Sequence, residues 1–188
     1  MSIIYKNLLK CIKLHINSSD SLQGNLRVLD YGCSTGSLLS LLDKFIKSHR
    51  ISLNPKLYGL DIDEKLLGCA QIKVPTAELL LSKTNSLPFS SNSLDIIIAT
   101  QVLEHIDDPC FAFKEFSRVL QNNGLLYFSC PNAASIGSWY KRDRWHSHPC
   151  VFQSVKWKNI VCVGNCRPLN WTRWPARMYR PLLLLFVA

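Results

Sequence analysis

The sequence predicts an α/β protein with a doubly wound, mostly parallel sheet and helices on both of its faces. Three observations support this fold class. Short apolar runs of strand length alternate with segments of helical apolar spacing. Most of these runs end in polar or turn-forming residues. The chain has 188 residues, of which 47% are hydrophobic, so it can bury a sizeable core.

The predicted elements follow one another regularly along the chain. A first helix has apolar residues at helical spacing, and from there strands and helices alternate. The predicted helices are 3–16, 37–49, 64–73 and 108–120, and the predicted strands are 26–31, 57–63, 77–83, 94–100 and 125–132. Residues 50–56, 86–93 and 121–124 are predicted as loops or turns, and Pro131 ends the fifth strand. Residues 160–164 and 182–188 are further candidate strands. They do not define the closing C-terminal hairpin, so the sheet can be incomplete there.

The net charge of +9 is unevenly distributed. Residues 1–138 hold 13 Lys/Arg and 12 Asp/Glu, whereas residues 139–188 hold 9 Lys/Arg and one acid, Asp143. We therefore expect a balanced globular domain over 1–138 and a basic, aromatic-rich segment of undefined structure over 139–188. Arginines among aromatic residues suit RNA or an anionic membrane surface, or the aromatics pack on the sheet. No apolar run approaches the ~20 residues of a membrane helix.

Eight cysteines occur without the continuous apolar segment of a signal peptide. They are expected to be thiols in a reducing compartment, and the predicted localisation is cytoplasmic. One group of possible metal ligands lies in the basic segment; its members are His146, His148, Cys150, Cys162 and Cys166. It lacks a C-x-x-C pair and has loose spacing, so no metal site is expected.

The ends of the first two strands hold the residues of greatest chemical interest. Asp30 precedes Gly32-Cys33-Ser34-Thr35-Gly36, and Asp61 ends the second strand. A glycine turn before a helix allows a ligand to approach the backbone and the positive end of the helix dipole. A strand-end carboxylate can accept hydrogen bonds from ribose hydroxyls. The glycine spacing differs from the G-x-G-x-x-G of dinucleotide-binding enzymes, and such turns also occur in doubly wound proteins that bind no nucleoside.

Further motifs follow in order between residues 26 and 132. They are VLDYGCSTG, YGLDID, LPF, LDIIIAT, VLEHI.DP, E.SRVL and G.L..S.PN, where dots stand for intervening residues. In this combination the chain resembles the class I S-adenosylmethionine-dependent methyltransferases, in the type 11-like subgroup that acts mostly on small molecules. The resemblance implies a Rossmann-like fold, S-adenosyl-L-methionine as cofactor, and residues 1–138 as the domain that binds it.

The resemblance also implies roles for individual residues. Asp30 orients the turn and approaches the methionine amine, and Asp61 holds the ribose hydroxyls. The remaining residues implied at the cofactor are Gly32, Cys33, Ser34 and Gly36 at the methionine moiety, Ile62 and Asn85 at the adenine, and Gln101 between methionine and substrate. Two departures from the family pattern stand out. Ser34 replaces the middle glycine of the turn, and Lys83 replaces an acid near the adenine, where Asn85 or a backbone group can substitute.

The implied reaction is methyl transfer by in-line displacement to a small-molecule acceptor, which can be a metabolite or a lipid-like or sugar-like compound. His105 is the predicted catalytic base because VLEHI lies at the mouth of the site, and the alternative is a loop histidine that only caps the next helix. Glu104 is a second candidate base, with a solvated acid as the alternative. Two other functions remain open: a non-catalytic binding or regulatory module, and an RNA methyltransferase that uses the basic segment. The acceptor and the oligomeric state are not defined by the sequence.

Overall fold

The computed structural model describes residues 3–18, 24–49, 54–84, 86–129 and 161–163. In chain order the elements are α1 (Ile3–Ser18), β1 (Asn25–Tyr31), α2 (Ser37–Ser48), β2 (Asn54–Asp61), α3 (Glu64–Lys73), β3 (Glu78–Leu81), β4 (Leu94–Thr100), the 3₁₀ turn η1 (Leu103–His105), α4 (Pro109–Val119), β5 (Leu120–Ser129) and β6 (Val161–Val163). Every predicted helix is present, and so are the five main predicted strands. The candidate strand at 160–164 is confirmed as β6.

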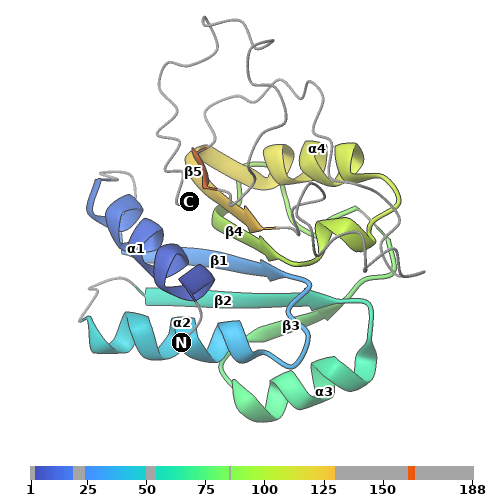
Figure 1. The fold of residues 1–188 in the computed structure, drawn as a ribbon, viewed down its shortest axis with the longest axis horizontal. Coiled ribbons are helices and arrows are strands. Elements are labelled where there is room, and N and C mark those ends of the chain that lie inside the picture. Colours follow the sequence, from blue (N-terminus) through green and yellow to red (C-terminus); the bar gives the residue numbers. More distant parts are fainter. Residues whose placement is uncertain (1–2, 19–23, 50–53, 85, 130–160, 164–188) are drawn as a thin grey trace, which may run out of the picture.

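The strands form one sheet in the order β3-β2-β1-β4-β5-β6, and all of the pairings are parallel (Figure 1). The predicted doubly wound α/β fold is therefore confirmed. The strand β1 pairs with both β2 and β4, so the strand order reverses beside the carboxyl end of β1. In open α/β sheets this position is the usual ligand-binding site.

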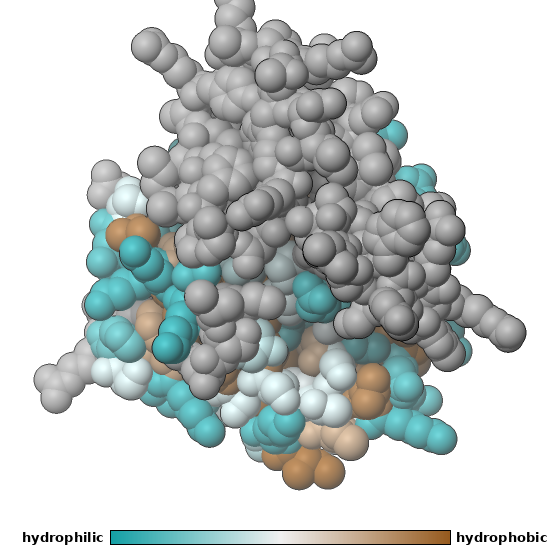
Figure 2. All heavy atoms as spheres, viewed as in Figure 1, coloured by the Kyte–Doolittle hydropathy of each residue, from teal (hydrophilic) through white to brown (hydrophobic). Residues whose placement is uncertain are grey.

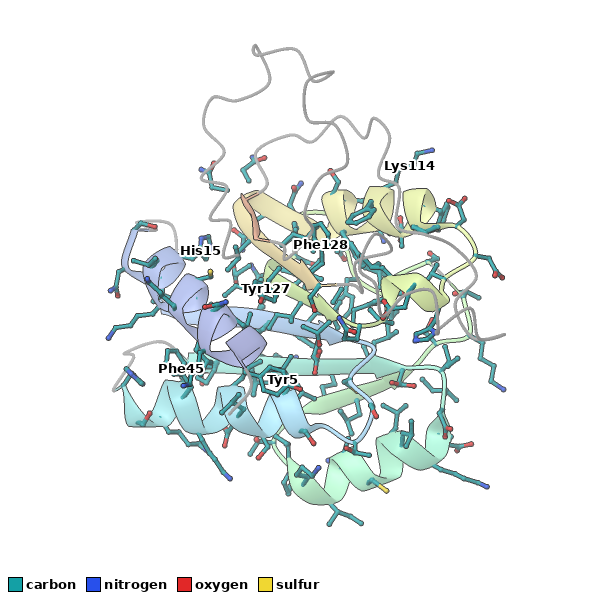
Figure 3. All side chains as sticks on the ribbon, viewed as in Figure 1. Tyr5, His15, Phe45, Lys114, Tyr127 and Phe128 are labelled. Carbon is teal, nitrogen blue, oxygen red and sulfur yellow. The ribbon has the colours of Figure 1, made fainter. Side chains whose placement is uncertain are left out.

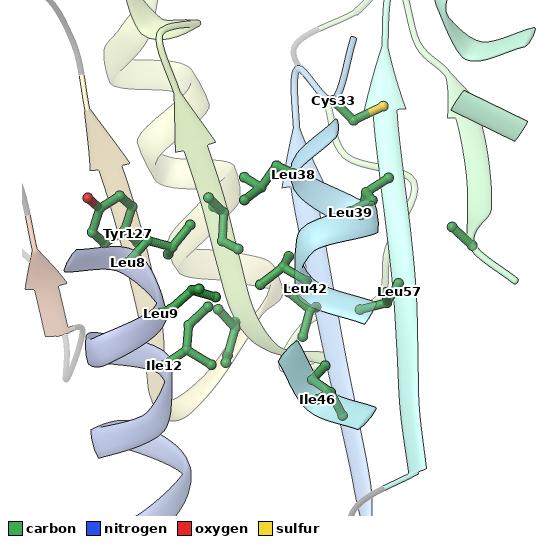
Figure 4. Close-up of a cluster of buried hydrophobic side chains, with 14 of the residues drawn as sticks. Leu8, Leu9, Ile12, Cys33, Leu38, Leu39, Leu42, Ile46, Leu57 and Tyr127 are labelled. Atoms are coloured by element: carbon green, nitrogen blue, oxygen red, sulfur yellow. The ribbon is translucent and has the colours of Figure 1, made fainter. Parts of the chain in front are cut away.

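Helices cover both faces of the sheet, with α1, α2 and α3 on one face and α4 on the other. Figure 4 shows apolar side chains of α1 and α2 packed over β1, β2 and β5 in the first core. The second core lies under α4 and includes Phe113 and Phe116, both fully buried. Neighbouring side chains of β5 point to opposite faces of the sheet. Tyr127 belongs to the first core, and Phe128 packs against the second (Figure 3).

Two predicted loops are partly strand. The predicted loop 50–56 is wrong at its end, because Asn54 to Lys56 pair in register with Asn25 to Arg27 of β1. The predicted turn 121–124 lies inside β5, where the pairing register with β4 shifts between Leu94 and Ile96. Asn123 in this stretch has a left-handed φ of 64°. Asparagine tolerates that conformation, so the chain bends without leaving the sheet.

Aspartates fix the starts of α3 and α4. The carboxylate of Asp63 accepts hydrogen bonds from the backbone N–H groups of Lys65 and Leu66. Asp108 accepts from Phe111 N–H, and Pro109 occupies the first turn of α4. Both caps satisfy N–H groups that have no partner within the helix. The cap of α4 is thus supplied by Asp108, and His105 belongs to the preceding 3₁₀ turn.

The basic segment 139–188 lies outside the described residues except for the backbone of β6. Its predicted roles toward RNA or an anionic membrane surface, and the domain division at residue 138, therefore stay untested predictions. Among the helices that the structure describes, none is long and apolar enough to cross a membrane. In the view of Figure 2, polar and apolar residues are interspersed on the described surface.

Candidate functional site

In the turn after β1, every second residue from Gly32 to Gly36 has a left-handed backbone conformation. The φ angles are 77° at Gly32, 48° at Ser34 and 71° at Gly36. The N–H groups of Gly32 and Cys33 both donate to the carbonyl oxygen of Leu60, at 2.8 and 3.0 Å. These hydrogen bonds attach the turn to the end of β2, so the first two strand ends form one unit.

Close packing explains the two glycines of the turn. A Cβ atom at Gly32 would lie 2.6 Å from Cγ2 of Val102, which follows β4. A Cβ atom at Gly36 would lie 2.9 Å from the Cβ of Ala70 in α3 and 3.1 Å from its Cα. Any side chain would therefore push the turn away from both neighbours, in addition to its strain at positive φ.

Asp61 connects the end of β2 to the turn. Its Oδ2 accepts a hydrogen bond of 2.7 Å from Ser34 N–H, and its Oδ1 accepts one of 3.0 Å from Asp63 N–H. The residue is 9% exposed. Each carboxylate oxygen can accept a second hydrogen bond, so this carboxylate can still hold two hydroxyl groups of a ligand.

Asp30 lies at the carboxyl end of β1 and is 2% exposed. Burial, and then the negative charge of Asp61, raise the pKa of Asp30 to about 7. A cationic group placed beside both carboxylates would favour the ionised form of Asp30. The two acids thus form an electronegative position at the point where the strand order reverses.

The side chain of Cys33 does not face the strand-end site. It is 4% exposed and belongs to the core under α1 and α2. Burial raises the pKa of this thiol to about 12, with further contributions from Asp30 and Asp61. Only the backbone of Cys33 can therefore line a ligand at the turn, and its thiol is not a nucleophile at neutral pH.

Gln101 follows β4 and has a left-handed φ of 54°. Its backbone N–H donates to the carbonyl oxygen of Ser129 at 2.7 Å, and its side chain reaches Ser129 Oγ at 3.5 Å. The residue itself is exposed. Non-glycine residues in this conformation cost energy and often occur at functional sites.

The segment after Gln101 includes both predicted base candidates. Glu104 is 3% exposed, and among the described residues its Oε2 is a buried oxygen without a hydrogen-bond partner. The interpretation of Glu104 as a solvated acid is therefore wrong. His105 is exposed, and its catalytic role stays a prediction.

Two other predicted residues concern the adenine. Ile62 follows Asp61 and is 71% exposed, so an apolar surface faces solvent directly beside that carboxylate. Asn85 lies outside the described residues. The residues missed by sequence reasoning are Val102, against Gly32, and the pair Glu115 and Arg118 of α4. The i,i+3 acid and arginine of E.SRVL were a signal that could have identified the pair.

The site suits the cofactor that the resemblance implies. The N-terminus of α2 has no side-chain hydrogen-bond cap, so its N–H groups can bind a carboxylate. The Asp30 carboxylate suits an ammonium group, and the Asp61 carboxylate suits hydroxyls. No group of three potential metal-ligating side chains occurs within the described part of the chain.

A separate hollow of about 590 Å³ lies at the opposite, amino-terminal end of the strands. It is lined by Asn25, Arg27, Asn54, Lys56, Tyr58, Asp95 and Gln121. Its cations already have partners, because Arg27 pairs with Asp95 at 3.3 Å and Lys56 with Glu78 at 3.1 Å. The cations of this hollow are therefore paired with neighbouring acids, and the hollow is distinct from the strand-end site.

Curated proteins with sequences similar to this chain are methyltransferases. A curated relative, the ubiquinone/menaquinone biosynthesis C-methyltransferase of Campylobacter jejuni, is 31% identical over 56% of this chain and 44% of its own length. The ubiquinone biosynthesis O-methyltransferase of Pelagibacter ubique is 26% identical over 69% of this chain and 51% of its own. The chain thus spans about half the length of these curated relatives.

A solved structure shows the same fold. The S-adenosylmethionine-dependent methyltransferase of Mesorhizobium loti superposes with a TM-score of 0.51 at 20% identity, over 70% of this chain and 55% of that one. The family model described as a methyltransferase domain matches residues 29–128. This range includes the turn after β1, Asp61 and the segment after β4. The chain therefore belongs to the methyltransferase domain family, as its motifs predicted, and S-adenosyl-L-methionine is the cofactor that this membership implies.

Proposed function

We propose that this chain transfers a methyl group from S-adenosyl-L-methionine to a small-molecule acceptor. The main support is the hydrogen bond between Ser34 N–H and Asp61 Oδ2. It joins the glycine turn to the acid of the next strand at the position where a doubly wound sheet binds ligands. Family membership supports the same activity.

The cofactor would be held mainly by backbone groups and two acids. The N-terminus of α2 would bind the methionine carboxylate, and Asp30 would bind the ammonium group. Asp61 would accept hydrogen bonds from the ribose hydroxyls through the lone pairs that Ser34 and Asp63 leave available. The exposed side chain of Ile62 would pack on the adenine, and Gln101 would lie between methionine and acceptor.

The bound cofactor supplies an electrophilic methyl group on a sulfonium. The residues of this chain then align the acceptor and exclude water, and alignment contributes roughly 7–11 kcal/mol to lowering such barriers. His105 would accept a proton from an oxygen or nitrogen nucleophile. The buried Glu104 carboxylate, next to it in η1, is the second candidate for that role.

The acceptor class is proposed from the family and the relatives. Two of the relatives are described as a C-methyltransferase of ubiquinone and menaquinone biosynthesis and an O-methyltransferase of ubiquinone biosynthesis. A metabolite of lipid-like or sugar-like character is therefore the proposed acceptor.

Titration of the full chain with S-adenosylhomocysteine by calorimetry tests the proposal. We expect saturable binding, and we expect Asp61→Ala to weaken it at least about tenfold, as loss of charged hydrogen bonds would. Equal affinity of the variant would contradict the placement of Asp61. Absence of binding by the wild type would favour the non-catalytic module. A mass-spectrometric search for metabolites that gain a methyl group would then identify the acceptor.

A further inference from the structure

The connection between β3 and β4 is attached to α4 through Leu87 and Phe89. The Leu87 N–H donates to Glu115 Oε2 at 2.8 Å, and Arg118 donates to the Leu87 carbonyl at 3.0 Å and the Phe89 carbonyl at 2.8 Å. Leu87 is 4% exposed and belongs to the core under α4. Two side chains of one helix therefore hold both backbone polar groups of Leu87.

Glu115 and Arg118 also hold each other in a fixed orientation. Arg118 Nε and Nη2 lie 2.7 Å from Glu115 Oε1 and Oε2, which is the bidentate arrangement of a guanidinium on a carboxylate. This contact, with the hydrogen bond from Leu87, lowers the pKa of Glu115 to about 2. The pair is therefore charged at any physiological pH and keeps its geometry.

The end of the same connection is attached to α4 as well. The N–H groups of Asn92 and Ser93 donate to the carbonyls of Arg118 and Val119. At the other end, Ser82 N–H donates to the carbonyl of Asp61 at 3.0 Å. Ser82 is thus anchored on Asp61, and Leu87 is anchored on the Glu115–Arg118 pair.

The order of the strands places this connection relative to a bound nucleoside. The methionine part of the cofactor would lie over the turn after β1, and the ribose would lie at Asp61 on β2. Because β3 is the next strand outward, the base attached to the ribose would lie toward the residues that follow β3. Lys83 in this stretch is exposed, and a lysine ammonium group donates hydrogen bonds but accepts none, so it does not pair with the amino group of adenine. Backbone carbonyls held in place can serve instead.

We propose that Glu115 and Arg118 are positioning residues that hold the base-binding wall of the cofactor site without touching the cofactor. The inference rests on the proposed function and adds the part of the chain that determines selectivity for adenine. The pair orients Leu87, and Leu87 limits the conformations of the stretch that begins at Ser82. Loss of the pair would therefore reduce recognition of the base more than recognition of the methionine part.

The test measures a ratio of two dissociation constants in the full chain. S-inosylhomocysteine differs from S-adenosylhomocysteine only at one edge of the base, where an oxo group replaces the 6-amino group and N1 carries a hydrogen. Both constants would be measured by calorimetry, directly or by competition. The variants are Arg118→Met, Arg118→Lys and Glu115→Gln. The matched control is Lys47→Met, which breaks the exposed Lys47–Asp43 pair on α2.

We expect the wild type to prefer S-adenosylhomocysteine by about tenfold, the effect of one well-made hydrogen bond and one avoided mismatch. Arg118→Met should reduce this preference to less than about threefold, and Arg118→Lys should restore part of it, because lysine keeps the charge but not the bidentate geometry. Lys47→Met should leave the ratio unchanged. A global loss of stability would change the folded fraction without changing the ratio.

Two results would overturn the inference. One is a wild type that binds both ligands equally, and the other is an Arg118→Met variant that stays folded and keeps the wild-type ratio. Glu115→Gln keeps the shape of the side chain and replaces Arg118→Met in the test if that variant fails to fold. An unchanged ratio of dissociation constants in Glu115→Gln would also overturn the inference. Failure of the wild type to bind either ligand would contradict the proposed function itself.

Discussion

The Oδ2 atom of Asp61 accepts a hydrogen bond of 2.7 Å from the backbone N–H of Ser34, which lies 27 residues earlier in the chain. This contact crosses from the end of β2 to the turn after β1. It forms at a residue with a left-handed φ of 48°, a backbone conformation that favours glycine. The strained backbone of Ser34 is therefore held by Asp61, the same acid that we propose to bind the ribose.

Ser34→Gly should stabilise the folded chain. A non-glycine residue in the left-handed region costs about 1–2 kcal/mol, and the greater freedom of glycine in the unfolded chain offsets up to about 1 kcal/mol of that gain. The hydrogen bond to Asp61 uses the backbone and is retained. We expect an increase of about 0.5–1 kcal/mol in the free energy of unfolding by denaturant titration. Asn92→Gly is the control, since asparagine already tolerates its φ of 54°. A Ser34→Gly variant that is less stable than the wild type would show that the backbone of Ser34 is not strained.

Gly32→Ala should destabilise the chain by more than about 2 kcal/mol, because the added methyl group meets Val102 at 2.6 Å and the backbone has positive φ. Gly68→Ala in α3 is the matched control. Nothing lies within 4 Å of its Cβ position, so alanine there should stabilise the helix by about 0.5–1 kcal/mol. Thermal unfolding of both variants checks the pair of predictions, and equal effects at the two glycines would show that the close approach to Val102 is absent.

Asp30 should make the stability of the ligand-free chain depend on pH. Burial and the charge of Asp61 raise its pKa from 3.8 to about 7. The folded state then retains a proton that the unfolded state releases, so this contribution is complete below about pH 4 and is lost as the pH rises to about 7. Asp30→Asn should therefore gain stability over the wild type more at pH 8 than at pH 4.5. Denaturant titrations at both values measure this, and a constant difference would contradict the raised pKa.

Asp95 should contribute to the free energy of unfolding but not to the affinity for the cofactor. Its carboxylate accepts hydrogen bonds from Arg27 N–H, from Arg27 Nε and from Gln121 at the amino-terminal end of the sheet. Asp95→Ala leaves these partly buried donors without this partner, which costs about 1 kcal/mol or more. The affinity for S-adenosylhomocysteine should stay within twofold of wild type, roughly the scatter of such measurements. A large loss of affinity in a folded variant would place part of the site at the wrong end of the strands.

The sequence by itself determined the order and type of the elements. Apolar runs such as Leu94–Thr100 and the helical spacing of Glu64–Lys73 depend on nearest neighbours along the chain, and both elements were predicted with their exact ends. The strand ends with Asp30 and Asp61 were found for the same reason. Loop boundaries were less well predicted, because Asn54 to Lys56 become strand only through pairing with β1.

Only the tertiary structure decided which side chains face the site. The thiol of Cys33 turns into the core, Glu104 is buried, and Arg118 reaches Leu87 and Phe89, 31 and 29 residues away. Local pattern does not determine these contacts, because each depends on two segments that meet only after the sheet has assembled. The periodicity of apolar residues predicts whether a segment is a helix or a strand. The direction of a side chain at a strand end depends instead on how it packs against segments distant in the sequence.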